Sequence, residues 1–172
     1  MAGYINVDKY GEPDVRYDLE VFPWPWSDSS VSEVNINHVL EHLGQSTEVY
    51  LKIIQELYRV CKNNAIIHIR APHPRHDDFL TDPTHVRPVT PEGFSLFSQR
   101  LNKEWRQDGF SNTSLGLYLK VNLEIGKVKY LPDPYWIQEL QQGKITEKDL
   151  YRKAKDNNNV FKEIDMEVKV VK

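Results

Sequence analysis

The chain has 172 residues and a mass of 20.2 kDa, a length that suits one globular domain with a single core. With 40% hydrophobic and 27% charged residues it is not a disordered chain, and no apolar run reaches the roughly 18 residues that span a bilayer. The net charge of −3, with basic and acidic residues interleaved toward the carboxyl end, argues against a nucleic-acid partner. The lone Cys61 and the absence of an apolar leader at the amino terminus predict a cytoplasmic protein.

The first part of the sequence predicts a sheet with a crossover helix. Short strands are predicted at residues 4–8, 15–18 and 31–37, the first two ending in an aspartate. A helix is predicted over 46–62, because apolar side chains recur there at three- and four-residue spacing after a capping Ser46 or Thr47. The apolar run 65–70 predicts a buried strand. A strand after a helix and earlier strands favours parallel pairing.

The second part predicts a different architecture. Residues 71–90 form a long polar loop with four prolines and three histidines, and such loops are commonly functional. A helix is predicted to begin at Thr90-Pro91. Alternating apolar residues predict half-buried antiparallel strands over 115–125 and 164–170. Short surface helices are expected in between, at residues 135–140 and 147–154.

Four segments in order resemble the class I S-adenosylmethionine-dependent methyltransferases, especially the type 11 small-molecule branch. They are Y-I-N-V-D at 4–8, Asp18-Leu19 with the F-P-W and D-S-S-V pieces of 22–31, V-N-I-N-H-V-L-E-H-L at 34–43, and E-L-Y-R-V-C-K at 56–62. The match covers about residues 4 to 101. It implies an α/β, Rossmann-like sheet of mixed parallel and antiparallel strands. Residues 102–172 would complete this domain with antiparallel strands and short helices, so that residues 1–172 form a single domain.

The resemblance implies S-adenosylmethionine as cofactor and a small molecule as substrate. Ligands of an open α/β sheet bind outside the carboxyl ends of its strands. Asp8 would there accept the two ribose hydroxyls, and Asp18 the exocyclic amine of adenine, with the Leu19 backbone beside it. Asn37, at the end of the strand over 31–37, completes the expected cofactor-binding set.

Two histidines are the expected catalytic residues. His38 follows Asn37 and would act as a general base or position the methyl acceptor. His85 lies in the 71–90 loop, which in the family reading covers the active site. Catalysis would consist mainly of positioning, because the sulfonium is already an activated donor.

The expected sheet lacks one strand. In the family, a first strand and its Gly-rich loop precede the strand that residues 4–8 resemble, and here only three residues come before Tyr4. Two strand edges would then be left open, so residues 4–7 must pair with 31–37 or with a second copy of the chain. We expect a homodimer. The missing loop also leaves open a catalytically inactive, methyltransferase-like binding or assembly protein.

A metal hydrolase is the third reading. His38-Val39-Leu40-Glu41-His42 spells H-x-x-E-H, the inverted zinc-protease signature, whose third ligand would come from the loop between His73 and His85. In the competing reading the apolar residues of this segment pack a short helix whose end Glu41 and His42 hold. We assign no metal from the sequence.

Overall fold

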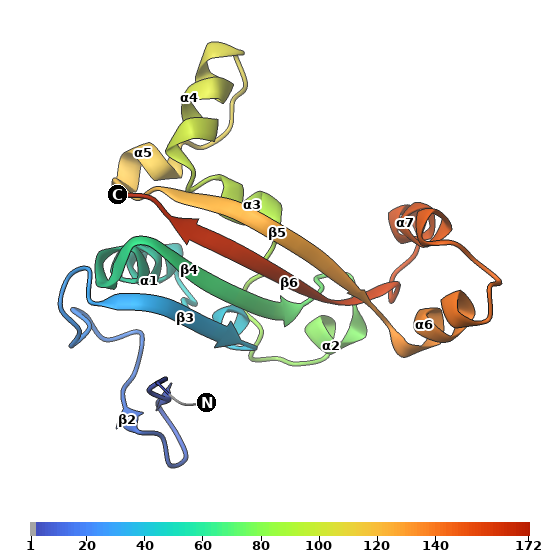
Figure 1. The fold of residues 1–172 in the computed structure, drawn as a ribbon, viewed down its shortest axis with the longest axis horizontal. Helices are drawn as coiled ribbons and strands as arrows, with labels where there is room; N and C mark the ends of the chain where they lie inside the picture. The colour runs from blue at the N-terminus through green and yellow to red at the C-terminus, as the bar shows by residue number, and fades with distance from the viewer. Residues whose placement is uncertain (1–2) are drawn as a thin grey trace.

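The computed structural model describes residues 3–172. A four-stranded sheet in the order β3-β4-β6-β5 forms its centre, and a two-stranded sheet, β1-β2, lies beside it near the amino terminus (Figure 1). The strands are β1 (Val7–Asp8), β2 (Val15–Arg16), β3 (Val31–Asn37), β4 (Cys61–Pro72), β5 (Leu123–Pro132) and β6 (Phe161–Val170). The helices are the 3₁₀ turn η1 (Leu40–His42), α1 (Thr47–Val60), α2 (Asp77–Leu80), α3 (Pro91–Ser95), α4 (Gln99–Gln107), α5 (Leu115–Leu119), α6 (Pro134–Gln141) and α7 (Glu147–Asp156).

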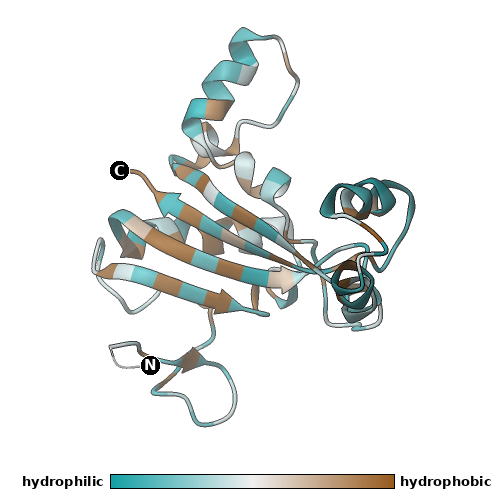
Figure 2. Ribbon diagram, turned by 45° about the vertical axis from the view of Figure 1, so that its right-hand side comes forward, coloured by the Kyte–Doolittle hydropathy of each residue, from teal (hydrophilic) through white to brown (hydrophobic). Residues whose placement is uncertain are grey.

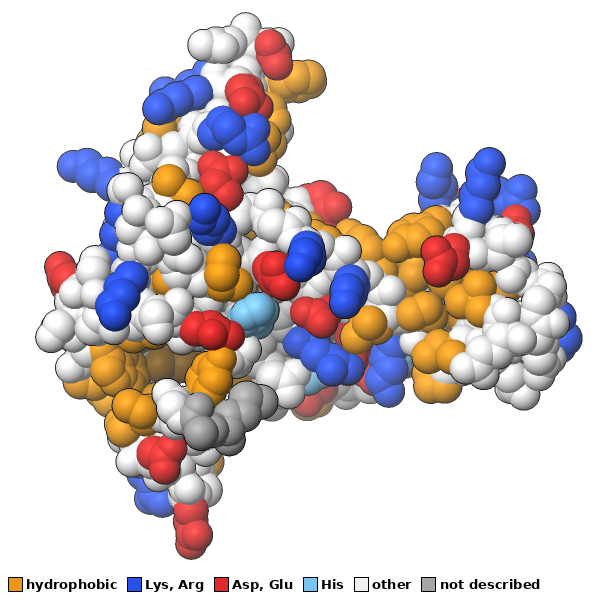
Figure 3. All heavy atoms as spheres, viewed as in Figure 1, with side chains coloured by type: hydrophobic (Ala, Val, Ile, Leu, Met, Phe, Trp, Pro, Cys, Tyr) orange, Lys and Arg blue, Asp and Glu red, His pale blue; other side chains and the backbone are white. Residues whose placement is uncertain are grey.

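The central sheet is mixed, as the sequence predicted. β3 pairs with β4 in parallel, whereas β6 is antiparallel to both β4 and β5. Hydrophobic and hydrophilic residues alternate along these strands (Figure 2). One face of the sheet is buried by α1 and α3, in a core whose members include Ile54, Leu57, Ile67, Phe94 and Val168. Acidic and basic side chains gather over the opposite face (Figure 3). The fold is thus held by one apolar layer between the sheet and its helices.

The local signals around α1 are confirmed in detail. The Ser46 hydroxyl caps the helix by accepting a hydrogen bond from Val49 N at 3.2 Å. The helix ends at Val60, and β4 begins at the next residue. The strand is therefore longer than the 65–70 run, and Asn63-Asn64 lie inside it rather than forming a separate break.

Residues 115–125 are the clearest correction to the predicted elements. The Leu-Gly-Leu-Tyr-Leu segment forms α5 instead of a strand, and β5 begins at Leu123. Tertiary contacts decide this, because Gly116 N donates to Leu96 O at 2.9 Å and Leu117 N donates to Asn102 Oδ1 at 3.2 Å. Alternating leucines fit a single helical turn as well as a strand, so the pattern could not distinguish the two.

Two further segments differ from expectation in detail. The 71–90 loop contains the short helix α2, and the helix starting at Thr90-Pro91 is divided into α3 and α4, with Ser98 capping the latter. The predicted surface helices are present as α6 and α7, which pack with the ends of β5 and β6 into a small second cluster around Leu150 and Phe161. Within residues 3–172, no helix is long and apolar enough to cross a membrane.

Candidate functional site

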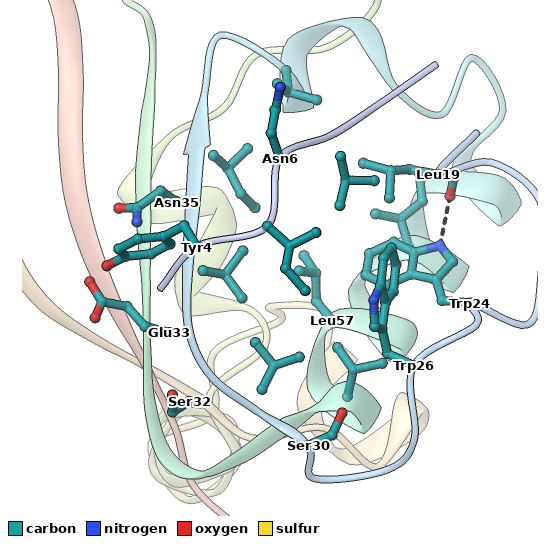
Figure 4. Close-up of a pocket in the computed structure, with 18 of the residues that line it drawn as sticks. Tyr4, Asn6, Leu19, Trp24, Trp26, Ser30, Ser32, Glu33, Asn35 and Leu57 are labelled. Carbon is teal, nitrogen blue, oxygen red and sulfur yellow. Dashed lines mark hydrogen bonds between the residues drawn. The ribbon is translucent and has the colours of Figure 1, made fainter. Parts of the chain in front are cut away.

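A cavity of about 690 Å³ lies between the amino-terminal segment and β3 (Figure 4). Residues 3–7 form one wall and residues 30–36 of the β3 region form the other. Its floor is apolar, with Trp24, Trp26 and Leu57 among the lining side chains. A recess lined by hydrophobic side chains is visible here beside the amino-terminal segment in Figure 3. The cavity has the apolar lining that suits a flat organic ligand or an additional stretch of chain.

One wall of the cavity is the edge of β3, and the other is the segment of residues 3–6 that leads into β1 at Val7. Among the described residues, β1 pairs only with β2 and β3 pairs only with β4, so the predicted direct pairing of residues 4–7 with β3 is not found. Tyr4 lies beside Glu33 and Asn35 on β3 (Figure 4). Its pKa is raised, mainly by a hydrogen bond to Glu33. The amino-terminal segment therefore touches β3 through side chains while the backbone edges stay apart.

Asp8 and Asp18 lie at the same edge of the small sheet. β1 and β2 are parallel, and Tyr17 N donates to Asp8 O at 2.9 Å, which holds the two strand ends together. The Asp8 Oδ1 atom accepts from Tyr10 N at 2.7 Å. Lys9 Nζ is 2.6 Å from Asp18 Oδ2, and this contact is the main reason that the pKa of Asp18 is lowered. Lys9 thus favours the ionised form of Asp18, and a local turn holds the Asp8 carboxylate in place.

The two aspartates stand next to the cavity rather than in its wall. Their chain neighbours Val7 and Leu19 line it. The Leu19 carbonyl accepts a hydrogen bond from Trp24 Nε1 at 3.0 Å, which fixes the buried indole against the loop. Leu19 thus lines the cavity itself, whereas Asp8 and Asp18 each adjoin a residue that does.

His38 lies at the carboxyl end of β3, between two carboxylates. Its backbone N donates to Arg70 O at 2.9 Å, and its φ of 53° turns the chain away from the sheet. The ring Nε2 is 3.1 Å from Glu163 Oε1, and Nδ1 is 3.3 Å from Glu41 Oε1. Each ring nitrogen therefore faces one carboxylate. The preceding Asn37 is exposed and lies opposite Arg70 in the sheet register.

His85 belongs to a different set of contacts. Its Nδ1 is 2.9 Å from Phe79 O, and its ring stacks on Phe79 at a centroid distance of 5.3 Å. The ring centroid of His42 is 4.6 Å away. His85 therefore contacts His42 of η1, whereas His38 contacts Glu41 of η1.

Sequence reasoning missed Glu163, which faces His38 from β6. The two residues are 125 positions apart, and only the pairing of β4 with β6 brings them together. It also missed the anchoring of the Trp24 loop. Glu56 Oε2 accepts from Trp24 N at 2.7 Å, although the E-x-x-R spacing that pairs Glu56 with Arg59 was visible in the sequence.

The fold is similar to that of a SAM-dependent methyltransferase from Archaeoglobus fulgidus, with a TM-score of 0.57 and 19% sequence identity over 90% of this chain and 66% of that one. The 1,6-didemethyltoxoflavin-N1-methyltransferase of Burkholderia thailandensis aligns with a TM-score of 0.49 and 9% identity, covering 96% of this chain and 60% of that one. No protein-family model and no curated protein matches the sequence. The first of these similarities identifies the methyltransferase fold, and the chain spans 66% of the length of that structure and 60% of the length of the second.

Proposed function

We propose that the protein is an S-adenosylmethionine-dependent methyltransferase that acts on a small molecule. The observation that supports this most directly is that Leu19 lines the cavity and that Asp8 and Asp18 adjoin its lining residues Val7 and Leu19. Asp8 ends β1, Asp18 follows the parallel strand β2 by two residues, and the neighbouring apolar space is lined by Trp24. Hydroxyl donors of a ribose and an adenine ring are a chemically suitable match for carboxylate acceptors next to aromatic side chains.

Each residue has a defined task in this proposal. Asp8 binds the ribose hydroxyls, and Asp18, kept ionised by Lys9, accepts from the adenine amine beside the Leu19 backbone. The cofactor supplies an electrophilic methyl group on a sulfonium. Asn37 and His38 lie at the end of β3, where His38 takes the proton of the acceptor and Glu163 pairs with the resulting imidazolium. His85 orders the loop that covers the acceptor.

Loss of the Asp8 carboxylate is expected to weaken cofactor binding. Calorimetry with S-adenosylhomocysteine should detect binding to the unmodified protein, and Asp8→Ala should weaken it by about 1 to 3 kcal/mol, because the hydroxyl donors lose an ionised acceptor. Asp156→Ala, at the exposed end of α7, is the matched control and should leave the affinity unchanged. No binding by the unmodified protein at millimolar ligand would favour the inactive binding protein instead.

We further propose that the protein is a homodimer in which a strand of the second copy pairs with the open edge of β3. Unpaired edges are templates for association, and here the edge faces an apolar cavity. His38 N donates inward to β4, so the alternation of a strand directs the N–H of Asn35 outward.

Asn35→Pro is therefore expected to weaken the dimer without removing a β3–β4 hydrogen bond. Sedimentation should show the unmodified chain as a dimer and the variant shifted toward monomer, with circular dichroism confirming that the variant keeps its secondary structure. A chain that stays monomeric at every accessible concentration would contradict the dimer and leave the cofactor proposal standing.

A further inference from the structure

Three side chains that the proposed methyl transfer does not require as a group meet beside η1. Glu41 and His42 come from η1 itself, and His85 comes from the loop after α2. Each offers a ligand atom, and these atoms all lie within 4.8 Å of one another. We propose that Glu41, His42 and His85 form a binding site for one divalent transition-metal ion.

The first argument is the state of Glu41. Its side chain is completely buried, and within residues 3–172 neither carboxylate oxygen accepts a hydrogen bond. His38 Nδ1 lies 3.3 Å from Oε1 but is not aligned for a hydrogen bond, and it faces only one of the two oxygens. A buried carboxylate without a partner is strongly destabilising, so such groups are normally paired or coordinate a cation. A metal ion would supply the missing charge.

The second argument is the orientation of His42. The Thr84 hydroxyl donates its proton to Asp82 Oδ1 at 2.6 Å, so it can only accept from His42 Nδ1, 2.8 Å away. This network places the proton of neutral His42 on Nδ1. The lone pair is therefore on Nε2, the arrangement in which metal-binding histidines are held by their outer hydrogen bond.

The same holds for His85. Its Nδ1 is 2.9 Å from the Phe79 carbonyl, which can only accept, so Nδ1 must carry a proton. The lone pair of the neutral ring lies on Nε2, which is 3.8 Å from Asp82 Oδ2. A neutral His85 would thus turn a lone pair toward this carboxylate, an arrangement that a cation between the two groups would stabilise. Asp82, which is partly exposed, is accordingly a suitable fourth ligand.

The donor set selects the class of metal. Two imidazole nitrogens with carboxylate oxygens suit zinc and its first-row neighbours, whereas magnesium and calcium prefer oxygen ligands alone. Because bonds to zinc are about 2.0 to 2.2 Å long, tetrahedral ligand atoms stand roughly 3.4 Å apart, so the donors would have to approach one another by up to about 1.4 Å, a rotamer-scale adjustment. Since Val86 N also donates to Glu41 O at 2.8 Å, the ion would fasten the 81–86 loop to η1.

This site differs from the H-x-x-E-H reading. That signature needs an α-helix in which His38 and His42 share the metal, but here His38 has a φ of 53° and only Leu40–His42 form a 3₁₀ turn. The Nε2 atom of His38 faces Glu163 instead. The proposed set keeps His42 and replaces His38 by Glu41.

The test is titration of the metal-stripped protein with Zn²⁺ and, separately, Co²⁺. We expect one equivalent per chain, a rise in melting temperature with Zn²⁺, and visible absorption from Co²⁺ bound to nitrogen ligands. His85→Ala and His42→Ala should each weaken Zn²⁺ binding at least tenfold. Glu41→Gln should keep the fold, because it removes an uncompensated buried charge, yet lose the Zn²⁺-dependent rise in melting temperature.

Two further variants distinguish this site from its competitors. His38→Gln should bind Zn²⁺ as the unmodified protein does, and so should His68→Gln, which removes another histidine that lies next to a carboxylate. Failure to bind Zn²⁺ stoichiometrically, or loss of binding in His38→Gln with retention in Glu41→Gln, would overturn the proposal. None of these readouts depends on cofactor binding, so the outcome is independent of the methyltransferase proposal.

Discussion

Replacing Arg59 by methionine is expected to destabilise the fold by about 2 to 4 kcal/mol, because it leaves the buried Glu56 carboxylate without its counter-ion. Arg59 donates to both oxygens of Glu56, at 2.8 and 2.7 Å. It also donates to the carbonyls of Trp24 and Trp26. The Glu56 side chain is only 5% exposed and that of Arg59 27%, so the pair is only partly screened by water. Urea unfolding of the variant would measure the loss.

A matched control is Arg100→Met, whose ion pair with Glu104 is exposed on both sides. That change should cost less than about 1 kcal/mol, as is usual for surface pairs. Adding Glu56→Gln to Arg59→Met should restore part of the stability, since the neutral amide needs no counter-ion. If the double variant is no more stable than Arg59→Met alone, the penalty does not arise from the uncompensated carboxylate.

The Glu56–Arg59 pair also makes the difference in unfolding free energy between the unmodified protein and Arg59→Met depend on pH. Arg59 is the main cause of the lowered pKa of Glu56, whose ordinary value is 4.5. A carboxyl whose pKa is lower in the folded than in the unfolded state contributes its full stabilisation above the unfolded pKa. The advantage of the unmodified protein over Arg59→Met should therefore be constant near neutral pH and shrink as the pH falls below 4.5 through the folded pKa of Glu56.

Gly44→Ala is expected to cause the second large loss, about 2 to 4 kcal/mol, because two effects add at this position. Gly44 has a φ of +72°, a conformation that is strained for alanine. An added Cβ would also lie 2.6 Å from the Cβ and 2.7 Å from the Cα of Tyr50, and the backbone of α1 cannot easily move away. Thermal or urea unfolding would measure the effect.

Gly109→Ala separates the two contributions. Gly109 has a similar φ of +77°, but an added Cβ would meet no atom within 4 Å. This variant should lose only about 1 kcal/mol, the cost of the backbone conformation alone. Equal losses of unfolding free energy in Gly44→Ala and Gly109→Ala would show that the structure accommodates the contact of the added Cβ with Tyr50 at no cost in stability. Because Gly44 follows η1 by two residues, Gly44→Ala should also weaken Zn²⁺ binding, whereas Gly109→Ala should not.

The sequence predicted those helices and strands whose caps lie within the segment itself or whose hydrophobic pattern fits only one type of secondary structure. The helix α1 has an apolar stripe and a serine cap, and β3 was predicted with its observed bounds. The mixed sheet followed from the order of elements and from the alternation in β6. The prediction failed at 115–125, where hydrogen bonds donated by Gly116 N and Leu117 N to Leu96 and Asn102 hold a helical turn that the alternating leucines do not specify.

The candidate sites divide in the same way. Asp8, Asp18, Leu19, Asn37, His38 and His85 could be named from motifs in the sequence, because each stands at a fixed place beside a strand end or in a recognisable loop. Their roles remain proposals. The contacts of these residues could not be predicted from the sequence, because their partners are distant along the chain. Glu163, which faces His38, lies on β6, and Thr84, which orients His42, lies in a loop 42 residues further along the chain.

The sequence by itself determined the periodic elements, the parallel strand pair around α1 and the acidic strand ends, because these depend on side-chain spacing along the chain. Only the tertiary structure decided that the side chain of Glu41 is buried with no hydrogen-bond partner among residues 3–172 and that His42 and His85 lie side by side. It also decided that residues 3–7 and β3 face each other across a cavity. The burial of a side chain and the position of the proton on a histidine depend on neighbours that come from several helices, strands and loops. Hydrophobic periodicity records which face of an element is buried, and carries no information on which polar atoms meet there.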